Sequence, residues 1–246
     1  MIFYFTGTGN SFAAAKAIAE ADEPLISIAE AARKKEFTYE LKNSARIGFV
    51  FPEYCSTVPE PVTAFIRSLE IHCRHPYVFA IITRGGVVSF AAGLLRHELA
   101  QRRIRLHYAC SVRMPNNAVT YSDTPDESKQ KRLFAAAEQK LSDIRETLRQ
   151  RPVRPVRGGL MATVCQPVLC KSSSTVPFRA EDSCVSCGAC ARNCPDEAIR
   201  MEHGRPVWVK ATCAFCHGCI NRCPAGAIEY GTKTPGRRRY VHPDFQ

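Results

Sequence analysis

Apolar runs and segments with helical spacing alternate along the first 150 residues. Two of the runs, Arg46–Phe51 and Tyr77–Thr83, are almost continuously apolar, as expected for strands covered on both faces of a parallel sheet. Weaker runs predict three further strands, at Ile2–Phe5, Leu25–Ile28 and Ile104–Val112. Five strands that alternate with helices predict a doubly wound α/β sheet.

Four helices are expected between and after these strands, and the sequence signals for them differ in strength. The first carries Phe12, Ala15, Ile18 and Ala19 on one face, and the next two span Pro59–Leu69 and Ser89–Arg103. The last begins at a capping box, Thr124-Pro125-Asp126-Glu127, with proline at the first helical position, and ends before Pro152.

The loop after the first strand, Thr6-Gly7-Thr8-Gly9-Asn10-Ser11, has the composition of a phosphate site. Its two glycines permit a close approach of the backbone, and its three hydroxyls and the following helix N-terminus supply hydrogen-bond donors. It is not a Walker loop, because no Lys-Ser or Lys-Thr follows at the required distance. Nor is it a dinucleotide fingerprint, because Phe12 occupies the third glycine position. A glycine-rich turn without a ligand is the alternative.

Eight of the 13 cysteines form two copies of one pattern. Cys184-x2-Cys187-x2-Cys190-x3-Cys194-Pro195 is repeated 29 residues later as Cys213-x2-Cys216-x2-Cys219-x3-Cys223-Pro224. Three thiolates two residues apart on a tight turn can reach three corners of one cubane, and the fourth points toward the other cluster. Disulfides are not expected in a reducing cytosol, and zinc sites do not need two four-cysteine runs that each end in Cys-Pro. The pattern therefore predicts two [4Fe–4S] clusters.

This region resembles a bacterial two-cluster ferredoxin, which is a small α+β domain. The resemblance implies that one cluster is held by Cys184, Cys187, Cys190 and Cys223, and the other by Cys213, Cys216, Cys219 and Cys194. Four further cysteines have no such spacing and are expected to be buried small hydrophobes: Cys73, Cys110, Cys165 and Cys170.

The loop at Thr6–Ser11 resembles the FMN-phosphate loop of flavodoxins, which lies at the same end of the first strand. Ligands of such sheets lie beyond the carboxyl ends of the strands, near the switch point. The resemblance implies that the loops after the third and fourth strands hold the isoalloxazine ring. In this chain they are Pro52–Thr57, where Tyr54 would stack on the ring, and Thr83-Arg84-Gly85-Gly86, whose glycine backbone would approach it.

Taken whole, the chain resembles the flavodoxin–ferredoxin fusion proteins of anaerobic bacteria and archaea. The resemblance implies a flavodoxin-like FMN domain at 1–150, a linker at 151–178 and a two-[4Fe–4S] ferredoxin domain at 179–246. Prolines in the linker predict an extended connector that packs partly on the domains. Such proteins often carry Met-Pro-x-Asn-Tyr after the fifth strand. Here Met114-Pro115-Asn116-Asn117-Ala118 lacks the tyrosine, so no ring-stacking role transfers to that position.

Charge adds little to this interpretation. The formal net charge is +11, with 20 basic against 16 acidic residues in 1–150 and 14 against 7 in 151–246. A basic chain invites a nucleic-acid interpretation, but four thiolates around a 2+ cubane leave about −2 per cluster, and a flavin phosphate subtracts more. We therefore expect no nucleic-acid partner. Arg237–Arg239 are expected to be either a solvated tail or a patch that steers an acidic redox partner.

The chain is expected to be soluble and cytoplasmic. No apolar run approaches the roughly 20 residues of a membrane helix. The start at Met1–Phe5 lacks the charged region and the cleavage site of a signal peptide.

These features predict an electron-transfer protein with one FMN and two [4Fe–4S] clusters that serves unidentified redox partner proteins. A flavin holds one or two electrons whereas a cluster passes one at a time, so joining them in one chain couples the two modes. The alternative is an FMN-dependent reductase of a quinone or another small acceptor, fed through the clusters. No second nucleotide motif is evident for NAD(P)H, which favours the carrier, and no catalytic residue is assigned. A redox-sensing regulator would need an output module, for which the chain has no spare length.

Overall fold

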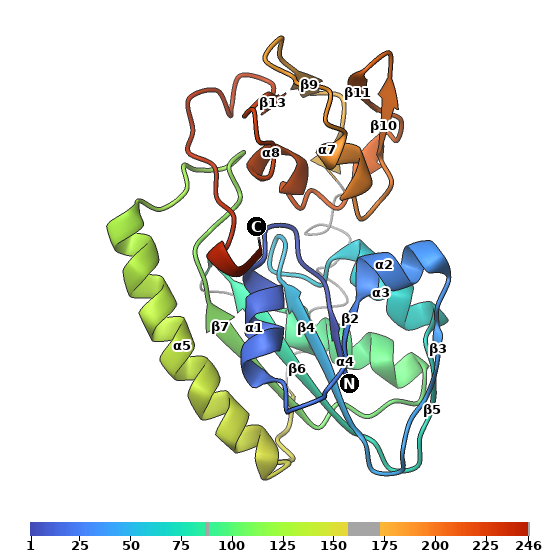
Figure 1. Ribbon diagram of the computed structural model, residues 1–246. Coiled ribbons are helices and arrows are strands. Elements are labelled where there is room, and N and C mark those ends of the chain that lie inside the picture. The colour runs from blue at the N-terminus through green and yellow to red at the C-terminus, as the bar shows by residue number, and fades with distance from the viewer. Residues whose placement is uncertain (87–88, 157–172, 246) are drawn as a thin grey trace.

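The computed structural model describes residues 1–86, 89–156 and 173–245. Figure 1 shows a sheet covered by helices and, above one end of it, a smaller cysteine-rich part. The strands of the first part are β1 (Ile2–Tyr4), β2 (Leu25–Ser27), β3 (Thr38–Glu40), β4 (Arg46–Pro52), β5 (Glu70–His72), β6 (Tyr77–Arg84) and β7 (Tyr108–Arg113). Its helices are α1 (Asn10–Ile18), α2 (Ile28–Lys34), α3 (Glu60–Ser68), α4 (Ala91–Gln101) and α5 (Glu127–Arg149).

The main sheet has the strand order β2-β1-β4-β6-β7, and every neighbouring pair is parallel. If these five strands are numbered 1 to 5 in chain order, the strand order is 2-1-3-4-5, which is that of flavodoxins. The switch point then lies between β1 and β4. The predicted doubly wound five-stranded sheet is therefore confirmed. Two features were not predicted: the helix α2, and a separate parallel pair formed by β3 and β5.

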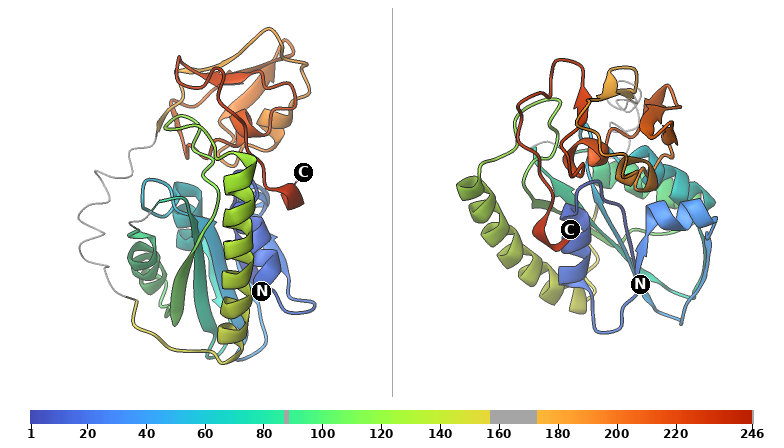
Figure 2. Two further views of the ribbon diagram at one scale, coloured as in Figure 1. Left: turned by 90° about the vertical axis from the view of Figure 1, so that its left-hand side faces the viewer. Right: turned by 45° about the horizontal axis from the view of Figure 1, so that its top comes forward.

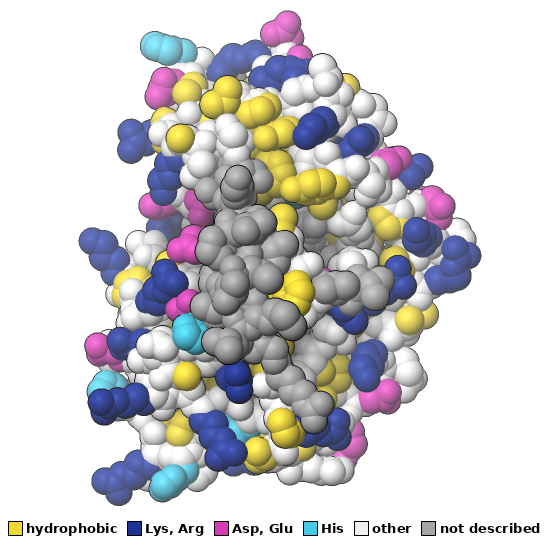
Figure 3. Space-filling view, turned by 180° about the vertical axis from the view of Figure 1, so that it is seen from behind, with side chains coloured by type: hydrophobic (Ala, Val, Ile, Leu, Met, Phe, Trp, Pro, Cys, Tyr) yellow, Lys and Arg dark blue, Asp and Glu magenta, His cyan; other side chains and the backbone are white. Residues whose placement is uncertain are grey.

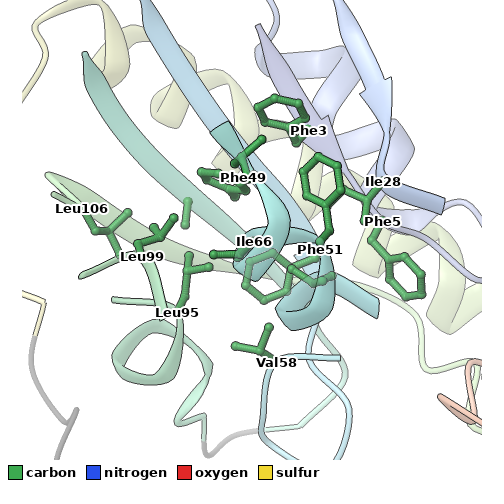
Figure 4. Close-up of a cluster of buried hydrophobic side chains, with 14 of the residues drawn as sticks. Phe3, Phe5, Ile28, Phe49, Phe51, Val58, Ile66, Leu95, Leu99 and Leu106 are labelled. Atoms are coloured by element: carbon green, nitrogen blue, oxygen red, sulfur yellow. The ribbon is translucent and has the colours of Figure 1, made fainter. Parts of the chain in front are cut away.

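Both faces of the sheet are packed, which explains the continuous apolar runs of its central strands. Phe49 and Phe51 of β4 join a core covered by α2, α3 and α4, part of which Figure 4 shows with Phe3 and Phe5. Val50 points to the opposite face, which α1 and α5 cover; Figure 2 shows α5 running along that side. Each fully buried side chain of this kind contributes about 1.5–3 kcal/mol.

Several predicted boundaries differ from the structure by one or more residues, and three of the differences have a clear local reason. Asp126 and not Thr124 caps α5, because its carboxylate accepts a hydrogen bond from the Lys129 N–H at 2.8 Å. The last strand begins at Tyr108, after a turn at Arg103, whose φ is 58°. The second strand ends at Ser27, whose hydroxyl caps α2 by accepting from the Glu30 N–H at 3.3 Å.

The cysteine-rich part consists of short elements arranged as two copies of one unit. The 29-residue repeat extends to the backbone, since left-handed residues recur at Ser186 and Phe215 and precede the helices α7 and α8 at Gly188 and His217. The elements are β8 (Ser173–Ser174), β9 (Phe178–Ala180), α7 (Ala189–Arg192), β10 (Ile199–Glu202), β11 (Arg205–Trp208), β12 (Thr212–Cys213), α8 (Gly218–Asn221), β13 (Ile228–Tyr230) and the 3-10 helix η1 (Pro243–Phe245).

The cysteine-rich part lies over the carboxyl ends of the sheet strands, and the chain then returns to the first part. Figures 1 and 2 show the C-terminal segment running back down so that η1 lies beside α1. The ring of Phe245 packs on that of Phe12, with centroids 5.5 Å apart. The predicted linker falls largely on residues 157–172, outside the described residues, so its boundaries stay predictions.

Two surface predictions can be compared with the structure. Among the described residues, no helix combines the length and the apolarity that a membrane crossing requires. On the face shown in Figure 3, Lys and Arg side chains are mixed with Asp and Glu and form no single basic stripe.

Candidate functional site

The eight cysteines of the repeated pattern are arranged so that the fourth of each run lies beside the other run. Burial raises the pKa of Cys190, and the nearby charges of Cys223 and Cys184 raise it further. Burial likewise raises the pKa of Cys216, with Cys194 the first of the charges that add to it. The side chains are thus arranged with Cys223 near the first run and Cys194 near the second.

Backbone N–H groups point at these sulfurs in both copies of the repeat. Ala198 N–H donates to Cys194 Sγ and Ala227 N–H donates to Cys223 Sγ, each over 3.3 Å. Hydrogen bonds of this kind stabilise thiolate ligands and set the potential of the cluster that they hold.

The thiols of the second run are costly to ionise without a compensating cation. Burial raises the pKa of Cys213 to about 11 and places those of Cys216 and Cys219 well above the ordinary thiol value. The iron core of a cluster supplies the positive charge that such a group needs. Two groups of four thiols with N–H donors at their sulfurs therefore fit two [4Fe–4S] clusters.

The two runs differ in their access to solvent. Cys187 in the first run is exposed, whereas all four cysteines of the second run are half-buried. Cys213 lies on the wall of a cavity between the two parts of the molecule.

This cavity has a volume of about 710 Å³, within the range of small-molecule and cofactor sites. Its floor consists of the loops at the carboxyl ends of β1, β4, β6 and β7, and its roof belongs to the cysteine-rich part. The floor residues are 6–8, 10, 11, 52–60, 83–86, 115–118 and 121, and the roof residues are Asp196, Lys210, Thr212, Cys213, Ala214, Phe215 and His217. Every residue predicted to contact a flavin lines the cavity except Gly9.

The hydroxyls of the predicted phosphate loop already have protein partners. Thr6 Oγ1 accepts from the Gly9 N–H, and Thr8 Oγ1 accepts from the Asn117 side chain, each over 2.9 Å. Ser11 Oγ lies 2.7 Å from Thr83 Oγ1. A hydroxyl that accepts one hydrogen bond can still donate its own hydrogen. Thr6 and Thr8 therefore remain able to donate to an anionic oxygen in the cavity.

Gly9 does not line the cavity, and the structure gives a separate reason for a glycine at this position. Its φ is 100°, and a Cβ there would lie 2.4 Å from Cβ of Phe245 and 2.8 Å from Cβ of His242. The left-handed backbone and the returning C-terminal segment together explain this glycine.

The loop after β4 places strained and unsatisfied groups at the cavity. Cys55 and Ser56 both have left-handed φ angles, 47° and 64°, in a tight turn closed by two backbone hydrogen bonds between Tyr54 and Thr57. Such residues cost about 1–3 kcal/mol each and gather at functional sites. Among the described residues, Oε2 of Glu53 and Oη of Tyr54 are buried without a hydrogen-bond partner. Burial also raises the pKa of Glu53. Each of these two groups needs a partner that the described residues do not supply.

Sequence reasoning missed Asn117, which joins the two parts of the molecule. Its side chain donates to Thr8 Oγ1 and, over 3.5 Å, to the carbonyl of Cys216, and its own carbonyl accepts from Asn221 over 3.0 Å. Nearby, Nε2 of His217 lies 2.8 Å from the hydroxyl of Thr120, and burial lowers the pKa of this histidine to about 3. An asparagine in a loop carries no sequence signal for such a contact.

The C-terminal segment was also misinterpreted. The prediction that Arg237–Arg239 form a solvated tail is wrong, because all three guanidinium groups are held within the chain. Arg237 donates to the carbonyl of Val119, Arg238 pairs with Asp123 at 2.9 Å, and Arg239 pairs with Glu229 at 2.6 Å.

Beyond the arginines, the segment reaches the predicted phosphate loop. The Tyr240 hydroxyl donates to Oδ1 of Asn10 over 2.5 Å, and the His242 N–H donates to the carbonyl of Thr8 over 2.8 Å. The loop is thus contacted at Thr8 and Asn10 by a segment that lies more than 200 positions away in the sequence.

The remaining cysteines do not all behave as predicted. Cys110 is half-buried and packs against the core under α1 and α5, which is close to the expected small hydrophobe. Cys73 is also half-buried, but its thiol donates to the carbonyl of Lys42 over 3.1 Å in an exposed hydrogen bond, so the prediction is wrong there. Cys165 and Cys170 lie outside the described residues.

Comparison with known proteins identifies the cysteine-rich part. Residues 183–228 match the family model of the 4Fe-4S dicluster domain, so the chain contains such an iron–sulfur domain. No curated protein matches the chain. A solved structure described as a "putative flavoprotein" from Bacteroides uniformis is similar over 46% of this chain and 88% of that one. It is 21% identical, with a TM-score of 0.35. The flavodoxin-like fold assigned above rests on the strand order alone.

Proposed function

We propose that this chain is an electron-transfer protein that binds two [4Fe–4S] clusters and one FMN and serves redox partner proteins. When bound, the clusters would supply one-electron steps and the flavin both one- and two-electron steps. One observation carries the proposal: Cys213 of the iron–sulfur domain lines the same cavity as the Thr6–Ser11 loop.

The iron–sulfur domain is in direct contact with that loop. A Cβ on Gly218 would lie 3.1 Å from the carbonyl oxygen of Gly7, so the two backbones are in van der Waals contact. Close contact within one chain replaces a bimolecular encounter by an intramolecular step at high effective concentration.

The different exposure of the cysteines suggests which cluster would exchange electrons with a partner protein and which with the flavin. The group that contains the exposed Cys187 would exchange electrons with a partner at the surface. The group that contains Cys213 would exchange them with the cavity. The arrangement is the same for either direction of flow.

The residues of the cavity floor would hold FMN in a defined orientation. Thr6, Thr8 and the N-terminus of α1 would bind the phosphate, because hydroxyls and the N–H groups of a first helical turn meet there. Tyr54 and the backbone of Gly85–Gly86 would contact the ring.

The test uses the full chain, reconstituted with iron, sulfide and FMN without oxygen. Cys187→Ala is expected to slow flavin reduction by a low-potential one-electron donor by about 100-fold, at the low end of the gain from linking two sites. Its FMN affinity is expected to stay unchanged, because Cys187 does not line the cavity. Cys73→Ala, which removes a cysteine outside the repeated pattern, is the control.

Equal rates in wild type and Cys187→Ala would contradict the relay and favour the FMN-dependent reductase. Release of FAD, or of no flavin, in mass spectrometry of the loaded protein would remove the flavin from the proposal.

A further inference from the structure

The hydroxyl of Tyr54 is buried between the two parts of the molecule and has no hydrogen-bond partner among the described residues. Tyr54 lines the cavity, and its ring packs edge-on against Phe5, with centroids 6.4 Å apart. Tyr54 therefore borders the cavity while its hydroxyl end is enclosed by protein. Because an unsatisfied buried hydroxyl costs about 1–3 kcal/mol, this group needs a partner that the described residues do not supply.

The neighbours of this hydroxyl belong to the iron–sulfur domain. The position of a Cβ on Gly7 would lie 3.1 Å from Tyr54 Oη and also 3.1 Å from Cβ of Cys216. The hydroxyl and the Cys216 side chain are therefore neighbours beside the backbone of Gly7. The absence of a side chain at Gly7 leaves the space between them open.

We propose that the Tyr54 hydroxyl donates a hydrogen bond to a sulfur of the cluster held by the second cysteine run, across the boundary between the two parts. The inference rests on the proposed function, because it requires that cluster to be present. A phenol is a donor, and the thiolates and sulfides of a cluster are acceptors. Tyr54 is then a positioning and tuning residue as well as a wall of the flavin cavity.

This contact would make the two clusters inequivalent. A hydrogen bond to a cluster sulfur stabilises the more negative, reduced state and so raises the reduction potential. Cys187 holds the position in the first repeat that Cys216 holds in the second, and it is exposed to solvent. Electrons would therefore be held preferentially by the cluster next to the cavity, and a residue of the flavin-binding part would set that preference.

The test is Tyr54→Phe in the full chain loaded with both clusters and FMN. The potential of each cluster is measured by redox titration followed by EPR, and the second-run signal is assigned by its loss in Cys213→Ala. We expect its reduction equilibrium to fall about tenfold, or about 59 mV for a one-electron couple, with the other cluster unchanged. The shift is expected to persist without FMN.

Tyr77→Phe is the matched control, because its hydroxyl donates to the carbonyl of Pro152 over 3.0 Å and does not line the cavity. It should leave both potentials unchanged. If Tyr54→Phe does not assemble both clusters, a difluorotyrosine at position 54 replaces it. Its more acidic hydroxyl should raise the potential of the same cluster.

Unchanged cluster potentials in both Tyr54 variants would overturn the inference. So would a shift confined to the flavin potential or present only with FMN bound, since the hydroxyl would then serve the flavin. Those results would leave the proposed function intact. Absence of clusters or FMN from the reconstituted wild type would instead refute the proposed function.

Discussion

The carbonyl oxygen of Cys216 lies 2.5 Å from the position that a Cβ on Gly7 would occupy. Side chains do not tolerate such a distance, and the atom concerned is backbone, which cannot rotate away. Glycine at position 7 therefore allows the iron–sulfur domain to seat on the first loop of the sheet, independently of any phosphate bound there.

Gly7→Ala is expected to destabilise the full chain by about 1–3 kcal/mol, because the added methyl group forces the two parts to separate. Gly86→Ala is the control, since the nearest atom to its new Cβ would be 3.8 Å away, an ordinary contact. Its effect is expected to stay within about 0.5 kcal/mol. Denaturant unfolding of both variants measures the difference. Equal free energies of unfolding in Gly7→Ala and Gly86→Ala would show that the backbone at Gly7 accommodates a methyl group without loss of stability.

Cys194→Ala tests the arrangement of the cysteines. Because Cys194 lies with the second run, its loss should remove the cluster of Cys213, Cys216 and Cys219 and leave that of the first run. Iron is expected to fall from about eight to about four atoms per chain. Iron analysis and EPR of Cys194→Ala and the reciprocal Cys223→Ala are compared. Loss of the first-run cluster in Cys194→Ala would mean that each run holds its own cluster.

Strong local patterns made the sheet and the cysteine runs predictable. Phe49, Val50 and Phe51 form one uninterrupted apolar run because successive side chains enter cores on opposite faces of the sheet. The spacing of the cysteines reflects the size of a cubane and needs no tertiary information. The loop at Thr6–Ser11 could be proposed as a binding loop for the same reason, since its glycines and hydroxyls are contiguous.

The boundary between the two parts could not be predicted, because its contacts join residues about 100 or more positions apart. Asn117 reaches Thr8, and Tyr240 reaches Asn10, through single polar side chains in irregular segments. Periodicity says nothing about such residues. The run Arg237–Arg239 suggested a surface tail, whereas the carbonyl of Val119 and the carboxylates of Asp123 and Glu229 hold it.

Thr8→Val tests the phosphate loop. The hydroxyl of Thr8 accepts from Asn117, which leaves its hydrogen free for a phosphate oxygen. A hydrogen bond to a charged group contributes about 1.5–3 kcal/mol, so FMN affinity should fall roughly tenfold or more. Asn117→Ala keeps the hydroxyl and should cost less, and the exposed Thr38→Val serves as control. Fluorescence titration of the flavin measures all three; an unchanged affinity in Thr8→Val would place the phosphate elsewhere.

Glu23 lies at the end of the sheet remote from the cavity. It should make the free energy of unfolding depend on pH. Burial opposes its ionisation, but hydrogen bonds from Arg46, the Glu20 N–H and the terminal amine outweigh it and lower its pKa. A carboxyl with a lowered folded pKa stabilises the fold above its unfolded pKa and loses that effect as pH falls through the folded value.

Glu23→Gln is therefore expected to reduce the free energy of unfolding by about 1.5–3 kcal/mol at neutral pH, and by less at acid pH. Urea unfolding from pH 7 down to about pH 2, a range that passes below the unfolded pKa of a carboxyl, follows the difference. Glu146→Gln, at an exposed pair with Arg149, is the control. A difference that does not shrink toward acid pH would show that the carboxylate charge is not responsible.

Tyr240→Phe tests whether the C-terminal segment shapes the cavity or only fastens the two parts together. Burial raises the pKa of the Tyr240 phenol, so it stays protonated and donates to Asn10, a residue of the cavity floor. Asn10 in turn donates to the carbonyl of Pro115, which lines the same cavity. Removing the hydroxyl leaves the Asn10 oxygen unsatisfied, so that the Asn10 side chain can rotate.

One hydrogen bond contributes about 1 kcal/mol, so the FMN affinity of Tyr240→Phe should fall about fivefold, while the cluster potentials stay unchanged. Tyr39→Phe removes an exposed hydroxyl that donates to the carbonyl of Glu36, away from the cavity, and should have no effect. If both variants bind FMN alike, the segment holds the iron–sulfur domain in place without positioning the loop, and deletion from Tyr240 onward should then slow electron transfer while leaving flavin binding intact.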